Sequence, residues 1–158
     1  MIEWDKINDN IEEISFKGEE KIGKVVSVYD GDSIKIVFPL INDMSNTLYK
    51  WNCRLINIDT PEIRTRNLKE KEFGLKIRDI LRDKILNKIV TIKCHDFDKF
   101  GRLLVEVFIK EIDMSTINKI TSVFSSKKNN NLISINEWLI KNNYARVYTG
   151  GKREPWNL

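Results

Sequence analysis

The chain has 158 residues, of which 41% are hydrophobic, and it includes seven Phe and four Trp. This length and composition fit a single globular domain and exclude an intrinsically disordered chain. No apolar run approaches the ~20 residues of a membrane helix, and the acidic N-terminus does not follow the pattern of a secretory signal peptide. We therefore expect an intracellular protein that does not bind membranes, with Cys53 and Cys94 both reduced.

The charge is unevenly distributed along the chain. The whole chain has a formal net charge of +4, and residues 1–20 have −5, which leaves +9 on residues 21–158. A basic body favours a polyanionic partner, nucleic acid ahead of anionic lipid, although a merely soluble basic protein would have the same charge. The abundance of Lys, Asn and Ile beside a single alanine, Ala145, is typical of an AT-rich genome and weakens the argument from lysine.

The first part of the chain predicts a helix followed by three strands. Residues 1–20 place four apolar residues at helical spacing with acids between them, which predicts an acidic helical appendage packed on the outside of the domain; covering a basic groove is an alternative role. Strands over residues 22–28 and 33–38, joined by the turn Tyr29-Asp30-Gly31-Asp32, predict a hairpin. After a polar connection over 39–47, a third strand is expected over 48–58, ending sharply at Thr60-Pro61.

The second part predicts a long helix over residues 70–86, strands over 89–95 and 103–109, and a helix over 135–143 that Ser134 caps. Residues 110–131 read as a mobile insertion, and the residues after 143 as loop. The expected fold is α+β and mainly β, a five-stranded OB-type barrel with about three helices and a short N-terminal helix. Its domain covers residues 21–150, with the appendage before it and a tail over 151–158.

Four acids lie at the predicted strand ends and turns: Asp30, Asp32, Asp59 and Glu62. Carboxylates gathered at one barrel rim suit Ca²⁺ or Mg²⁺ rather than zinc, which prefers His and Cys. The lone His95 also argues against a histidine-based metal site. Taken alone, however, Asp-Gly-Asp favours a plain β-turn, where Asp and Gly are the commonest residues.

Two arginines complete this constellation. Arg54 lies on the third strand and Arg102 follows the turn Asp-Lys-Phe-Gly. Guanidinium groups that face metal-bound carboxylates suit phosphoryl chemistry, because its transition state concentrates negative charge on phosphate oxygens. Surface positions or structural ion pairs are the alternative interpretation of both. Strict alternation places Arg54 and Asp59 on opposite faces of a flat strand, so their convergence requires a twist or bulge near Asn57.

These motifs resemble those of the staphylococcal nuclease (thermonuclease) family. The resemblance rests on D-G-D-S, R-L-I-N-I-D-T-P-E, D-K-F-G-R and I-N-E-W-L-I-K-N-N-Y-A-R-V, in this order, and covers residues 22–109 and 132–148. It implies an OB-type barrel and a phosphodiesterase that depends on one Ca²⁺ ion, acts on DNA and RNA as an endonuclease or exonuclease, and leaves 3′-phosphates. Other divalent metals would be alternatives.

The resemblance also implies roles for individual residues. Asp32 and Asp59 correspond to the family's calcium carboxylates, and Thr60 to the residue that supplies a backbone carbonyl. Glu62 corresponds to the glutamate that orients or deprotonates the attacking water. Arg54 and Arg102 correspond to the arginines that hold the phosphate and stabilise the transition state.

Nucleic-acid contacts are expected next to this site. Lys99 and Phe100 stand where the family has a Lys-Tyr pair, and Tyr148 is the candidate for base stacking. Arg64 and Arg66 provide an electrostatic approach. We expect a monomer that acts on single-stranded or frayed DNA and RNA with low sequence specificity. The alternatives are a non-catalytic nucleic-acid or protein-binding module of the same fold, and a structural OB-fold subunit.

Overall fold

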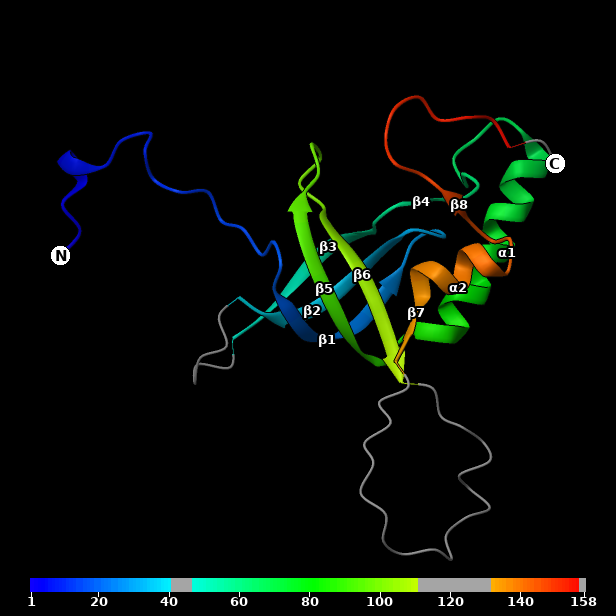
Figure 1. Cartoon of the computed structure of the whole chain (residues 1–158), viewed down its shortest axis with the longest axis horizontal. Helices are drawn as coiled ribbons and strands as arrows, with labels where there is room; N and C mark the ends of the chain where they lie inside the picture. Colours follow the sequence, from blue (N-terminus) through cyan, green and yellow to red (C-terminus); the bar gives the residue numbers. More distant parts are fainter. Residues whose placement is uncertain (41–46, 111–131, 157–158) are drawn as a thin grey trace, which may run out of the picture.

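The computed structural model describes residues 1–40, 47–110 and 132–156. Five strands build a barrel: β1 (Glu20–Val28), β2 (Ser33–Pro39), β3 (Leu48–Leu55), β5 (Ile89–Phe97) and β6 (Leu103–Lys110). The other elements are the 3₁₀ helix η1 (Trp4–Lys6), the short strands β4 (Ile58–Asp59), β7 (Leu132–Ser134) and β8 (Arg146–Val147), and the helices α1 (Leu68–Ile85) and α2 (Ile135–Lys141). Both α-helices lie on the same side of the barrel (Figure 1).

The barrel closes through one parallel pairing. Its strands follow the order β3-β2-β1-β5-β6 with antiparallel neighbours, and β3 then pairs with β6 in parallel, with Cys53 opposite Leu103. The long helix α1 connects the third and fourth barrel strands. This arrangement confirms the predicted OB-type barrel. The described residues contain two α-helices where about three were expected, and neither is long and apolar enough to cross a membrane.

Alternating side chains of the strands form the core. On β2, for example, Ile34, Ile36 and Phe38 are buried, and α1 contributes Ile77, Leu81 and Ile85 at helical spacing. These periods of two and about 3.6 residues are those that the sequence shows. Cys53 and Cys94 are free and buried, as expected, and burial raises the pKa of their thiols to about 12 and about 11, which leaves them unreactive.

The N-terminal segment differs from its prediction. Only Trp4–Lys6 forms a helical turn, and Trp4, Ile11 and Ile14 remain exposed on a segment that leaves the barrel (Figure 1). A short helix is marginal in water unless its apolar face packs against something, and these residues contact no core here. The first anchored side chain is Phe16, whose ring lies 5.0 Å from that of Trp51 at the barrel.

The structure contains two short strands, β8 and β7, that were not predicted from the sequence. The C-terminal loop includes a short strand, because β8 pairs with β4 in antiparallel register, with Asp59 opposite Arg146. The strand β7 was not predicted and extends the sheet beyond β6. Residues 41–46 of the polar connection and 111–131 of the expected insertion lie outside the described residues.

The helix α2 is joined to the barrel by one buried amide. As predicted, Ser134 caps the helix: its hydroxyl oxygen accepts from the Glu137 N–H at 3.3 Å. In the first turn, the Asn136 Oδ1 accepts from the Val107 N–H at 3.1 Å, and its Nδ2 donates to the carbonyls of Ile56 (3.0 Å) and Val105 (3.2 Å). Asn136 therefore links α2 to β6 and to the end of β3, next to the strand break that positions the candidate site.

Candidate active site

The strand that carries Arg54 bends before it reaches Asp59. β3 ends at Leu55, and Asn57 adopts a left-handed conformation with φ of 62°, which Asn tolerates better than most residues. The Arg54 Nη2 then donates to the Ile58 carbonyl at 3.2 Å across the bend. The break near Asn57 that convergence requires is thus confirmed, and it brings Arg54 and Asp59 to the same pocket.

The β1–β2 turn lies against the same bend. The Asp30 carboxylate accepts from the backbone N–H of Asp32 (3.1 Å) and of Ser33 (2.7 Å), which closes the turn. Gly31 between them touches Thr60, and a Cβ on this glycine would lie 2.7 Å from the Thr60 hydroxyl oxygen. Glycine at position 31 thus allows the turn to approach Thr60 closely. As a result, the turn and the end of the broken strand meet at one rim of the barrel.

Asp32 is the buried carboxylate of the rim. It is 5% exposed and pairs with Arg54, whose Nη1 lies 2.6 Å from Asp32 Oδ2. Burial raises the pKa of Asp32 to about 7, with a further rise from Asp30, whereas the Arg54 guanidinium lowers it. The ion pair with Arg54 favours the charged carboxylate and so opposes the effect of burial.

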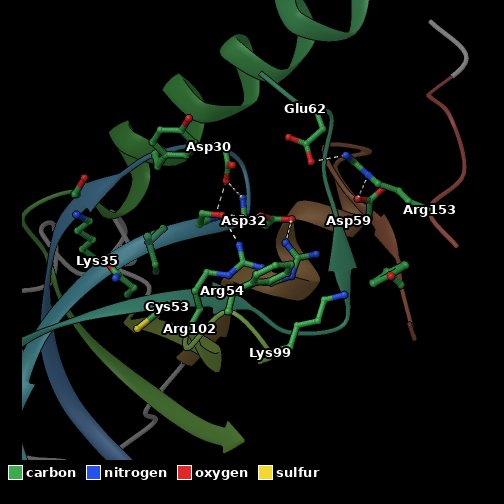
Figure 2. Close-up of a pocket in the computed structure, with 17 residues that line it drawn as sticks. Asp30, Asp32, Lys35, Cys53, Arg54, Asp59, Glu62, Lys99, Arg102 and Arg153 are labelled. Atoms are coloured by element: carbon green, nitrogen blue, oxygen red, sulfur yellow. Dashed lines mark hydrogen bonds and ion pairs between the residues drawn. The ribbon is translucent and has the colours of Figure 1, made fainter. Parts of the chain in front are cut away.

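The second arginine is held by the turn before β6. Asp98 accepts from the Arg102 Nε at 2.8 Å and from the Arg102 backbone N–H at 2.9 Å. The Arg102 Nη1 also donates to the Ser33 hydroxyl at 3.4 Å, and this hydroxyl donates to Asp32 at 3.1 Å. Arg54 and Arg102 therefore flank Asp32, one directly and the other through Ser33 (Figure 2).

The Asp98–Arg102 pair predicts a pH-dependent contribution to stability. Burial raises the pKa of Asp98, but hydrogen bonds from Arg102 and from the Phe100 N–H outweigh it and hold the pKa below the usual 3.8. A depressed carboxyl pKa stabilises the fold above pH 3.8, and this stability is lost as the pH falls through the folded-state value.

The loss of free energy of unfolding in Asp98→Asn should therefore be larger at about pH 7 than at about pH 3 in urea titrations. An equal loss of free energy of unfolding at both pH values would contradict a stabilising role of the Asp98 charge. Asp79→Asn, on the exposed side of α1, is the control and should change the free energy of unfolding by less than about 0.5 kcal/mol at either pH.

The acids and arginines line one pocket of about 690 Å³ (Figure 2). Of the residues expected from the sequence, it includes Asp30, Asp32, Arg54, Asp59, Glu62, Lys99, Phe100, Arg102 and Tyr148. Thr60 is buried beside it and touches Gly31. Arg64 and Arg66 lie outside the pocket on the exposed loop before α1, and the Arg64 guanidinium stacks 5.3 Å from the ring of the pocket residue Tyr29.

Sequence reasoning missed the cations that contact Asp59 and Glu62. Arg146 on β8 contacts Asp59 Oδ2 at 2.7 Å, and Arg153 in the tail contacts Asp59 Oδ1 at 2.5 Å and also pairs with Glu62. The Trp156 indole donates to Asp59 Oδ2 at 3.2 Å. The sequence does show two arginines and a Trp near the C-terminus. Nothing in their spacing, however, indicates that they contact a carboxylate about 90 residues earlier.

The family profile described as staphylococcal nuclease homologue matches residues 52–156, about two thirds of the chain. The chain belongs to this family. It is 32% identical over 150 residues to the uncharacterized protein MJ1439 of Methanocaldococcus jannaschii, covering 82% of this chain and 60% of that protein. It is also 31% identical over 86 residues to proteins named uncharacterized endonuclease from Escherichia coli and its O157:H7 strain, covering 54% of this chain and 47% of each. The chain thus spans about half the length of the curated relatives that it matches.

The acids of the pocket and the Thr60 carbonyl are the groups that could hold a divalent cation in this member of the staphylococcal nuclease homologue family. Within the described residues, no three His, Cys, Asp or Glu side chains form a preassembled metal cage. The donor chemistry nevertheless fits a hard cation, because the Asp59 carboxylate, the Thr60 carbonyl and the Glu62 carboxylate all contact one cationic group, the Arg153 guanidinium. Asp32 lies in the same pocket, paired with Arg54.

Proposed function

We propose that the protein is a divalent-metal-dependent nuclease that cleaves phosphodiester bonds of DNA and RNA and leaves 3′-phosphates. The observation that carries this proposal is the meeting of Arg54, Arg102 and the acids of two separate chain segments, the β1–β2 turn and the strand break, in one pocket. A structural OB-fold subunit has little need for such a collection of partly buried charges, because ion pairs removed from water contribute little to stability even when they are well paired.

The two arginines are the groups proposed to bind the phosphate. Arg54 and Arg102 both retain exposed surface, with 20% and 30% of the side chain accessible, although each has a fixed carboxylate partner. Such preorganised cations stabilise charge that develops on the phosphoryl oxygens without reorganising during the reaction. Asp32 and Asp98 hold the two arginines in place, which suits them to bind the transition state.

Glu62 is the proposed base for the attacking water. Its side chain is 47% exposed at the pocket, so water can reach the carboxylate. A general base must lie within hydrogen-bond reach of the water whose proton it accepts. Glu62 is proposed for this role because its carboxylate is open to the pocket edge, on the loop that leads from the strand break to α1.

Ca²⁺ is the proposed cofactor, held by Asp32, Asp59 and the Thr60 carbonyl, with other divalent metals as substitutes. When bound, the cation supplies Lewis-acid stabilisation and a template for the phosphate. The oxygen ligands are of the type that Ca²⁺ prefers. The pairing of Asp32 with Arg54 keeps this carboxylate turned into the pocket.

The substrate is proposed to be single-stranded or frayed nucleic acid, bound by a monomer with little sequence preference. Aromatic rings stack on any base, and basic side chains bind the phosphate backbone in a salt-dependent way. The proposed contacts are Lys99, Phe100, Tyr148, Arg64 and Arg66. The Lys99 ammonium lies 5.1 Å from the Phe100 ring, so a cation and an aromatic face are presented together at the pocket.

The test is digestion of single-stranded DNA and RNA with Ca²⁺, with Mg²⁺ and with chelator. We expect cleavage only with a divalent cation, products that carry 3′-phosphates by end-group analysis, and a rate about 10²–10⁴ lower in Glu62→Gln. Glu72→Gln makes the same change on the exposed side of α1 and should leave the rate unchanged. Nucleic acid that is bound but not cut under every condition would instead indicate a binding module, and cleavage that survives Glu62→Gln would contradict the assigned base.

A further inference from the structure

The Arg153 guanidinium is bound by the same oxygens that the proposed function assigns to the cation and the water. Its Nε lies 2.5 Å from Asp59 Oδ1, one terminal nitrogen pairs with Glu62 Oε1, and the other donates to the Thr60 carbonyl. Figure 2 shows Arg153 reaching Asp59 and Glu62 from a segment other than the strands that carry the acids. One arginine thus contacts a proposed metal carboxylate, a proposed metal carbonyl and the proposed base.

The segment that carries Arg153 is attached on both sides. Before it, Gly150 and Gly151 adopt φ values of 101° and 92°, and the Tyr148 hydroxyl donates to the Gly151 carbonyl at 2.7 Å. After it, Arg146 donates to the carbonyls of Glu154 and of Pro155, the latter at 3.2 Å. Residues 150–156 therefore form a loop that begins at a glycine turn and ends near the site. We call it the latch.

The end of the latch also binds Asp59. The Trp156 indole Nε1 donates to Asp59 Oδ2 at 3.2 Å, and the Arg146 guanidinium stacks 4.6 Å from the Trp156 ring. Asp59 is only 3% exposed, so its two oxygens are shielded from water and shared between the latch and Arg146. Burying a carboxylate is costly, and cationic partners such as these offset that cost.

A guanidinium and a divalent cation on these oxygens exclude each other. Both would occupy contact distance from Asp59 and the Thr60 carbonyl, where their repulsion is largest. If the closed latch predominates, the apparent metal affinity equals the intrinsic affinity multiplied by the fraction of molecules in which the latch is open. Because the coupling is reciprocal, metal binding must also release the latch.

We propose that Arg153 sets the metal affinity of this site by acting as an internal cation: the closed latch occupies the position of the divalent cation, and its release admits the metal. This inference rests on the proposed metal site. The glycine turn at 150–151 provides the backbone freedom for release. The latch would keep the nuclease inactive where divalent cations are scarce.

The first experiment is calorimetric titration of the full chain with CaCl₂. Arg153→Gln should bind Ca²⁺ about tenfold or more tightly than the wild type, because no cation has to be displaced. Lys152→Gln removes the same charge from the neighbouring residue, which is exposed and contacts neither Asp59 nor Glu62. It should change the affinity much less. Equal affinities of Arg153→Gln and wild type would overturn the latch while the metal site stands. Absence of binding to all three proteins, with MgCl₂ as well, would overturn both.

A second measurement uses the wild type and does not depend on how Arg153→Gln folds. The indole N–H signal of Trp156, assigned with Trp156→Phe, should move on Ca²⁺ addition toward the position of an indole that is bonded to water. The backbone amide signals of Gly150 and Gly151 should shift with the same midpoint. A purely electrostatic effect of Arg153 on metal affinity would leave these signals unmoved. Saturation with Ca²⁺ without a change at Trp156 would therefore overturn the proposal.

Discussion

Replacing Arg102 with alanine should lower the rate of nucleic-acid cleavage by about 10²–10³, the effect of removing one preorganised donor to the transition state. Arg102 is the better of the two arginines for this test. Removing Arg54 would leave Asp32 buried without its ion pair, so a loss of stability would confuse the result. Asp98, by contrast, still accepts from the backbone N–H groups of Phe100 and residue 102 when the Arg102 side chain is gone. The measurement is the initial rate on single-stranded DNA at saturating and at low substrate, which separates kcat from KM.

Two comparison variants sharpen this prediction. Arg82→Ala removes an exposed arginine from α1, outside the pocket, and should leave the rate within a factor of about two. Arg102→Lys keeps the charge but loses the planar fork that Asp98 holds, so it should restore only part of the activity. An Arg102→Ala enzyme that cleaves at the wild-type rate would show that Arg102 has no role in the reaction.

Replacing Asn136 with leucine should lower the free energy of unfolding by about 3 kcal/mol or more. The substitution leaves the Val107 N–H and the Ile56 carbonyl in the protein interior without their partner, and each unsatisfied buried group costs about 1–3 kcal/mol. Because Asn136 also fixes the chain just before Asn57, the bend that presents Asp59 should loosen in the variant. Urea unfolding followed by circular dichroism gives the free energy.

The matched control lies on the same helix. Asn142 at the end of α2 is exposed and its amide donates only to the Trp138 carbonyl among the described residues, at 2.8 Å. Asn142→Leu should therefore cost less than about 1 kcal/mol. Equal costs for the two substitutions would mean that the buried amide network contributes little, and that α2 is held to the barrel by its apolar side chains alone.

Much of the fold could be predicted from local patterns. The alternation of Ile34, Ile36 and Phe38 indicated a half-buried strand, and the stripe through Ile77 and Leu81 indicated a helix that packs on the barrel. Local chemistry also located the boundaries, since Ser134 caps α2 as expected. The N-terminal segment shows the limit of this approach, because its helical spacing has no apolar surface to pack against, and periodicity without a partner does not make a helix.

Part of the candidate site was also predictable, since the acids and the two arginines lie in motifs with recognisable chemistry. The break at Asn57 that unites them could be stated only as a requirement, because strand alternation alone places Arg54 and Asp59 on opposite faces. Asp98 was similarly overlooked as the group that holds Arg102, although it is only four residues away.

Local sequence patterns were sufficient to predict the barrel, the family and the residue types of the candidate chemistry, because strand and helix periods, turn residues and motifs are local properties of the chain. Which cation each carboxylate contacts depends instead on how the chain folds. Arg153 lies 94 residues after Asp59 and reaches it because β8 pairs with β4 and the glycine turn reverses the chain. Ion pairs depend on distance in space and not on spacing in sequence, so the group that occupies the proposed cation position became visible only in the folded chain.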